Sequence, residues 1–135
     1  MATNHTTNYA LNLWEPTDAF LREEFNENFQ KLDEATPHIA TGTYQGNNEG
    51  ERFLDLGFTP KAVYICTNYG CAYDSSGSNS FYLGGLIVAG GPLTGSGHIY
   101  GRIVEGGFKV YRISDGARTF ATNQLTITYH YLAIG

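Results

Sequence analysis

The sequence predicts a mainly β protein, an antiparallel β-sandwich head preceded by one N-terminal amphipathic helix. Apolar residues recur at helical spacing only between residues 14 and 35, whereas from residue 38 onward they alternate with a period of two. The 135 residues include 17 Gly, ten Tyr and eight Phe, a composition typical of many short strands and turns. Successive strands with no helix between them favour two packed antiparallel sheets.

The helix is predicted over residues 17–35. Pro16 suits the first helical turn, where its missing N–H costs no hydrogen bond. Thr17 or Asp18 is expected to cap the free amides at that end. The helix should stop near Pro37, because the residue before a proline resists helical angles. Residues 1–16 are then a polar arm that becomes ordered only when it docks on something, residues 17–36 a helical stem, and residues 37–135 the head.

One face of the predicted helix is apolar. Leu21, Phe25, Phe29 and Leu32 recur at spacings of four, four and three residues, which is the stripe of an amphipathic helix. A heptad interpretation adds Asn28 to the seam, where a polar residue can fix the register and the number of chains in a coiled coil. We expect these five residues to form an oligomerisation surface, and the alternative is a helix that lies on its own head.

The expected strands in the head are residues 39–44, 52–58, 61–67, 81–89, 99–104, 108–113 and 124–134. Residues 68–80 and 90–97 are expected to be loops, and residues 105–107 the turn of a hairpin. Gly84 and Gly85 interrupt an apolar run, which suggests a bulge or a close backbone contact.

The charge pattern excludes several classes of protein. Residues 14–35 carry seven acids and two bases, and therefore the whole net charge of −5. No cluster of Lys and Arg exists that could neutralise phosphates, so nucleic acid is not an expected partner. No apolar run approaches the ~18 residues of a membrane helix, and residues 1–10 have neither the basic nor the apolar region of a signal peptide. We expect a protein made in a cytoplasm without a signal peptide.

No catalytic residues, cofactor or metal site are expected. No spacing couples two carboxylates or builds a Ser/His/Asp arrangement. Cys66 and Cys71 are expected to be reduced thiols, and no neighbouring Cys or His spacing supports zinc. The four histidines lie far apart in the sequence; a site shared by three copies of one His on a trimer axis is a weaker alternative than exposed or hydrogen-bonded side chains.

One loop has the composition of a ligand site. Residues 68–82 combine aromatic side chains with Asn, Asp and Ser, and sugars require both flat apolar surfaces and hydrogen-bonding groups. The candidate ligand-binding residues are Tyr69, Tyr73, Asp74, Asn79 and Tyr82. The alternative is a loop whose tyrosines pack on the sandwich.

Two groups of motifs resemble phage proteins. Asn12-Leu-Trp14, Asp18, Phe20 and Phe25-Asn-Glu-Asn28 resemble the N-terminal helix of small phage and prophage tail proteins. Further motifs resemble the C-terminal tip of phage tail fibres and, in their order, H-type lectin modules: Thr41-Gly-Thr-Tyr44, Leu56-Gly-Phe58, Pro60-Lys-Ala-Val63, Gly106-Gly-Phe108-Lys-Val110 and Tyr131-Leu-Ala-Ile134.

This resemblance implies a homotrimer whose heads are held together by N-terminal helices, on a virion or a phage-derived particle. It implies no particular receptor. The expected function is a tail fibre or receptor-binding protein that attaches to a host-surface saccharide, docked on other tail proteins through its arm and helix. The alternatives are a structural virion protein that binds only other virion proteins, and a free H-type-like lectin; an enzyme that cleaves polysaccharide has no residues to support it.

Overall fold

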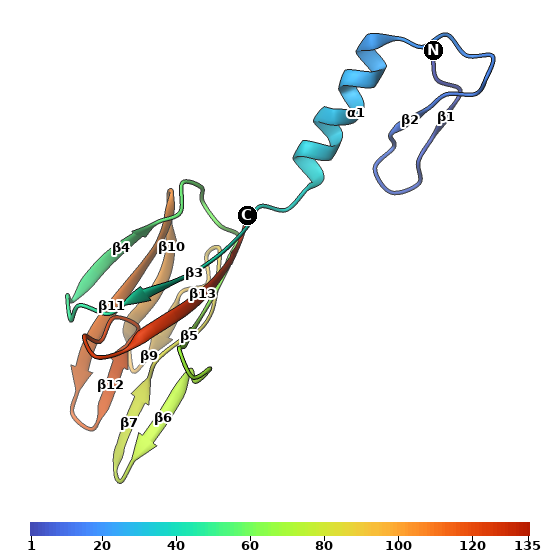
Figure 1. The fold of residues 1–135 in the computed structure, drawn as a ribbon. Helices are drawn as coiled ribbons and strands as arrows, with labels where there is room; N and C mark the ends of the chain where they lie inside the picture. The colour runs from blue at the N-terminus through green and yellow to red at the C-terminus, as the bar shows by residue number, and fades with distance from the viewer. The chain divides into compact units, whose positions relative to one another are not determined.

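The computed structural model describes residues 1–135 and consists of two compact units, Met1–Pro37 and His38–Gly135. The predicted fold class is confirmed: the chain is mainly β, with one helix and antiparallel sheets in a sandwich-like arrangement (Figure 1). The arm and the helix, which the sequence divides at residue 16, fold together as the first unit. The helix is too short and too polar to cross a membrane.

The N-terminal unit contains a small antiparallel ribbon and the helix. Strands β1 (Asn4–His5) and β2 (Asn12–Leu13) pair with each other, and α1 spans Arg22–Ala35. As predicted, the helix ends just before Pro37, and both the amide and the hydroxyl of Thr36 donate to the Leu32 carbonyl.

The predicted start of the helix is wrong, since residues 17–21 are not helical and Leu21 is an N-cap without a side-chain hydrogen bond. Asp18 does not cap the helix. Its carboxylate accepts hydrogen bonds from the backbone amides of Glu15 and Thr3, at 2.8 and 2.9 Å, and from the Thr3 hydroxyl. The Thr3 hydroxyl and these amides lower the pKa of the Asp18 carboxyl. Residues 15–18 therefore form a turn that fastens the start of the chain.

The head contains two sheets. The four-stranded sheet has the order β3 (Ile39–Gln45), β13 (Thr128–Ile134), β5 (Ala62–Thr67), β8 (Gly85–Val88), with every pair antiparallel. The second sheet has the order β6 (Tyr73–Ser76), β7 (Asn79–Tyr82), β12 (Arg118–Ala121), β11 (Gly107–Asp115), β10 (His98–Val104), β9 (Leu93–Gly95), and β4 (Glu51–Asp55) pairs with β11. Only β7 and β12 run parallel.

Several predicted boundaries need correction. Residues 68–80 are not a continuous loop, because they contain β6 and the first part of β7, and residues 90–97 contain β9. The run 81–89 is divided between β7 and β8. The strand predicted from residue 124 begins only at Thr128, because the Ile127 amide donates to the Gln124 carbonyl and closes a turn. The strand predicted to residue 58 ends at Asp55, where the side chain accepts from the Gly57 amide.

The hydrophobic core lies between the two sheets. Val63, Ile65 and Ile87 come from the four-stranded sheet, Phe108 and Val110 come from β11, and all five are fully buried. The predicted close contact at Gly84 is confirmed, since a Cβ there would lie 2.1 Å from the Ile65 carbonyl oxygen. A side chain at residue 84 would therefore push β5 away from its neighbour.

Residues 121–124 tie the two sheets together. Tyr44 and Tyr129, stacked with ring centroids 5.0 Å apart, extend from the four-stranded sheet into the core. The Tyr44 hydroxyl donates to the Thr122 carbonyl at 2.6 Å, and the Tyr129 hydroxyl donates to the Ala121 carbonyl and accepts from the Gln124 amide. We refer to residues 121–124 as the tie segment.

Side chains of the tie segment also complete the second sheet. The Thr122 hydroxyl donates to the Tyr100 carbonyl and accepts from the Tyr111 amide, where β10 and β11 stop pairing. The Asn123 amide nitrogen donates to the Asn47 side chain and the Glu49 carbonyl, at 2.7 and 3.0 Å. These side chains supply hydrogen bonds to buried backbone groups that lie outside the β-ladders.

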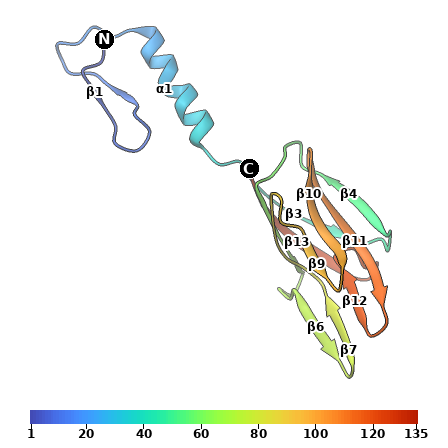
Figure 2. The ribbon, with the colours of Figure 1, turned by 180° about the vertical axis from the view of Figure 1, so that it is seen from behind.

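The head has two distinct ends. The Gly135 amide donates to the His38 carbonyl at 2.7 Å, so the first and last residues of the head lie together. The β6–β7 hairpin extends from the opposite end, as both views show (Figures 1 and 2). The hairpin and the point where the chain enters the head therefore lie at opposite ends of the head.

Tyr129→Phe should destabilise the head by about 1–3 kcal/mol, because the buried Ala121 carbonyl loses its donor. The melting temperature in differential scanning calorimetry should fall by roughly 4–8 °C for each kcal/mol. Tyr131→Phe is the control, since the Tyr131 hydroxyl has no hydrogen-bond partner. Equal melting temperatures for the two variants would show that the hydrogen bond from Tyr129 to the tie segment does not stabilise the head.

Candidate functional site

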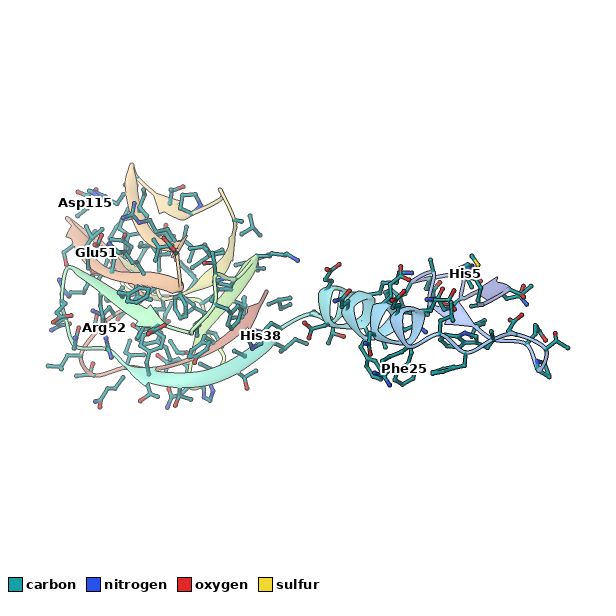
Figure 3. All side chains as sticks on the ribbon, turned by 90° about the horizontal axis from the view of Figure 1, so that it is seen from above. His5, Phe25, His38, Glu51, Arg52 and Asp115 are labelled. Atoms are coloured by element: carbon teal, nitrogen blue, oxygen red, sulfur yellow. The ribbon has the colours of Figure 1, made fainter.

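A row of aromatic rings runs along one side of the N-terminal unit. Trp14 lies 4.9 Å from Phe20, Phe20 lies 5.3 Å from Phe25, and Phe25 lies 4.9 Å from Phe29, measured between ring centroids. Figure 3 shows Phe25 projecting from the side of the helix. We refer to Trp14, Phe20, Phe25 and Phe29 as the aromatic row.

Most of the aromatic row is exposed. Trp14 is half-buried and its indole N–H donates to the Glu24 carboxylate at 3.1 Å, but Phe20 and Phe29 are 61% and 58% exposed. The N-cap residue Leu21 and the helical residue Leu32 are also exposed. No residue of α1 is buried. Since isolated helices of this length are marginal in water, the unit exposes an apolar surface that a partner would stabilise.

Asn28 is engaged within its own chain. Its side-chain oxygen accepts from the Asn12 amide at 2.6 Å, and its nitrogen donates to the Asn12 carbonyl at 3.0 Å. The Asn12 side chain in turn donates to the Glu24 carbonyl at 2.9 Å. These hydrogen bonds hold β2 against the helix, so the predicted arm docks on the helix of its own chain. The role of Asn28 in a seam between chains stays a prediction.

Asn28→Ala should release the ribbon from the helix, because two hydrogen bonds that bracket Asn12 are lost together. With about 1–3 kcal/mol removed, the Asn12 amide should exchange with deuterium roughly 5- to 150-fold faster. Asn26→Ala is the matched control, since Asn26 lies on the same helix, is exposed and makes no side-chain hydrogen bond. Unchanged exchange in Asn28→Ala would show that other contacts hold the ribbon.

The predicted ligand residues do not converge. Tyr73 pairs with Tyr82 across the β6–β7 hairpin, and Ser76 pairs with Asn79. Because side chains alternate along a strand, Asp74 and Asn79 lie on the opposite face of the hairpin from Tyr73 and Tyr82. Tyr69, 65% exposed, lies in the separate turn that follows β5. A single site made of all five residues is therefore excluded by the register.

Tyr82 also has a structural role. Its ring stacks on Phe120 at 4.8 Å and lies 6.3 Å from Tyr100 in a small second cluster of aromatic side chains. Tyr73 lies edge-on to Tyr82 at 5.4 Å and is 51% exposed. Tyr82 thus anchors the hairpin, while Tyr73 presents an accessible ring.

The register builds a different surface on the Tyr73 side of the hairpin. Ser80 lies next to Arg118 across the parallel β7–β12 pair, on the same face as Tyr73 and Tyr82. The Tyr73 hydroxyl lies 3.3 Å from the Ser80 hydroxyl, and the Arg118 guanidinium donates to the Ser96 hydroxyl at 2.9 Å. We refer to Tyr73, Ser80, Tyr82 and Arg118 as the tip platform.

A second polar pair lies beside the tip platform. His98 Nε2 is 3.4 Å from an Asp115 carboxylate oxygen, and Asp115 pairs with Arg118 in the β11–β12 ladder. An aromatic floor edged by hydroxyl, guanidinium and carboxylate groups has the composition that a saccharide requires. The sequence did not suggest Ser80, Arg118, His98 or Asp115, because the parallel β7–β12 pair joins distant segments that no local spacing connects.

The side chains that could bind a metal are not grouped. Cys66 and Cys71 are free thiols, and no three His, Cys, Asp or Glu side chains are grouped to hold a metal ion. His38 stacks on Phe58 at 4.1 Å, and His130 is exposed on the outer face of β13.

Comparisons with known proteins identify no relative: no family model, no curated protein and no solved structure matches the chain.

Proposed function

We propose that this protein is a trimeric attachment protein of a phage or phage-like particle. The N-terminal unit joins three chains and docks on other tail proteins, and the head binds a host-surface saccharide. The observation that carries the proposal is the polarity of the head, which has the chain entering at His38 and the tip platform at the opposite end. The resemblance of the sequence motifs to tail-fibre tips is consistent with this arrangement.

The aromatic row supports the joining role of the N-terminal unit. Aromatic rings supply the largest apolar contact area per residue, and here a row of them is exposed beside Leu21 and Leu32. The unit also carries the whole net charge of the chain, and the Glu24 carboxylate accepts a hydrogen bond from Trp14 of the row. Such a patch, rimmed by polar residues, is typical of a protein interaction site.

The tip platform supports the binding role of the head. A single exposed tyrosine and a few hydrogen-bonding groups give weak affinity, roughly millimolar or about −4 kcal/mol. Three heads in one trimer, and several trimers on one particle, can raise the avidity by roughly 10²–10⁴ without new contacts. Attachment therefore requires assembly as well as the site itself.

A structural virion protein is the second candidate. The stacking of Tyr82 on Phe120 and the division of the predicted ligand residues between two hairpin faces favour it. A free H-type-like lectin would share the head but would have no need of the aromatic row. Saccharide binding distinguishes the attachment protein from the structural virion protein. A loss of assembly when the aromatic row is changed distinguishes both of them from the free lectin.

Phe25→Asp should weaken assembly, because it places an unpaired charge in the centre of the aromatic row. Light scattering should give three times the 14.8 kDa chain mass for the parent and a shift toward one chain for the variant, with the dissociation constant raised at least about tenfold. Asn26→Asp adds the same charge elsewhere on the exposed helix surface and should assemble as the parent does. A parent protein that is monomeric at micromolar concentration would contradict the trimer.

Tyr73→Ala should lower binding to immobilised bacterial surface polysaccharides, because it removes the exposed ring of the tip platform. Loss of one stacking ring costs roughly 1 kcal/mol for each site, and several linked sites multiply that loss. Trimer mass and melting temperature should stay close to those of the parent.

Tyr9→Ala is the matched control for Tyr73→Ala, since Tyr9 is also 51% exposed but lies in the N-terminal unit. Equal binding by the two variants would remove Tyr73 from the site. A parent that binds no polysaccharide in a broad panel would favour the structural virion protein.

A further inference from the structure

The outer face of the four-stranded sheet is apolar at the end where the chain enters the head. Its first row crosses all four strands through Ile39, Ile134, Ala62 and Val88, which are neighbours in the ladders. Ile39 is 59% exposed, and Val88 is 45% exposed. An apolar row that continues across four strands is unusual on a surface that faces only water.

The second row continues the same face. Thr41, Leu132, Tyr64 and Leu86 are aligned across β3, β13, β5 and β8, and Leu86 is 59% exposed. The third row is polar and shorter, with Thr43, His130 and Cys66 in register. A groove of about 420 Å³ runs between the second and third rows. We refer to the first two rows as the apolar sheet face.

No formal charge lies on this sheet. The four strands contain no Asp, Glu, Lys or Arg, although residues 38–135 include six acids and six bases. Exposed sheets and edge strands normally carry charged side chains that prevent association. Here those charges lie on the other sheet and in the connecting loops, as with Glu51, which pairs with Lys109 and Arg102.

We infer that the apolar sheet face is covered by other copies of this chain, with the four-stranded sheets of the three heads turned toward the trimer axis. The inference rests on the proposed trimer and extends it from the helix to the head. A neutral face opposes contact with its own copies less than a charged one, because no like charges meet.

The size of the face favours a tethered copy over a separate partner. Sheet spacings give it a footprint of roughly 250 Å², whereas a stable interface buries about 800 Å² on each partner. A second protein would gain too little from this face alone. Copies joined through the aromatic row reach it at an effective concentration of about millimolar, because Ile39 follows the N-terminal unit by two residues.

Cys66 provides a probe of the covered face, since it lies beside the apolar rows and is half-buried in the single chain. In full-length protein carrying Cys71→Ser, Cys66 is the only thiol. Its reaction with a thiol reagent should be roughly tenfold slower at a concentration where light scattering shows the trimer than after dilution to the monomer.

Leu132→Asp tests the apolar face itself, and Ile99→Asp is its control. Leu132 is 39% exposed on this face, and Ile99 is 38% exposed on the second sheet. We expect Leu132→Asp to weaken assembly and to restore the monomer rate of Cys66 reaction, whereas Ile99→Asp should do neither.

The outcomes separate this inference from the proposed trimer. A trimer in which Cys66 reacts as fast as in the monomer, or in which Leu132→Asp assembles like Ile99→Asp, overturns the inference and leaves the trimer intact. Slow reaction of Cys66 in the monomer as well as in the trimer also overturns the inference, since the sheet face is then covered by a segment of the same chain. A monomeric parent overturns both. Assembly that survives Phe25→Asp but not Leu132→Asp supports the sheet face and contradicts the helical seam.

Discussion

The tie segment is the constraint on which the head depends. Two stacked tyrosines of the four-stranded sheet donate hydrogen bonds to carbonyls of residues 121 and 122, so the polar and apolar contacts between the sheets meet at one place. Burial raises the pKa of Tyr129 to about 12, so its hydroxyl remains a donor even at a pH where an exposed tyrosine ionises. The tie segment fixes the end of β12, and β12 carries the parallel pair with β7. The hairpin that bears Tyr73 is thus positioned by hydrogen bonds deep in the core.

The strands that obey a simple pattern were predictable, and those that depend on distant partners were not. The uninterrupted apolar run 61–67 predicts a strand covered on both faces; β5 (Ala62–Thr67) confirms the strand, but its side chains are buried only on the inner face. The β6–β7 hairpin was not predicted, because Ser, Asn and Gly dominate its sequence. Its order depends on the stacking of Tyr82 on Phe120. The helix start was misplaced because Asp18, a good cap in isolation, bonds instead to Thr3. In each case a tertiary contact outweighed the local preference.

The candidate site shows the same limit. Tyr73 and Tyr82 could be chosen from composition, since exposed aromatics in a loop favour binding. The placement of Asp74 and Asn79 on the opposite face could not be predicted. It depends on the alternation of side chains along β6 and β7, and the sequence of this segment is typical of a loop. Arg118 reaches the tip platform through a parallel pair between segments far apart in the chain. Local spacing identifies residue types suited to a ligand, and only the register decides which of them share a face.

Charge and apolar surface are divided along the chain in a way that favours self-association. The N-terminal unit carries the net charge of −5 together with an exposed aromatic row, and the head is neutral with an apolar sheet face. A separate partner for each surface would have to bind two small areas independently. In the proposed trimer, copies of the same chain would cover both surfaces, because contact at one surface raises the local concentration at the other. Only Thr36, Pro37 and His38 separate the helix from β3, so a trimer of this kind would couple the assembly of the stem to that of the head.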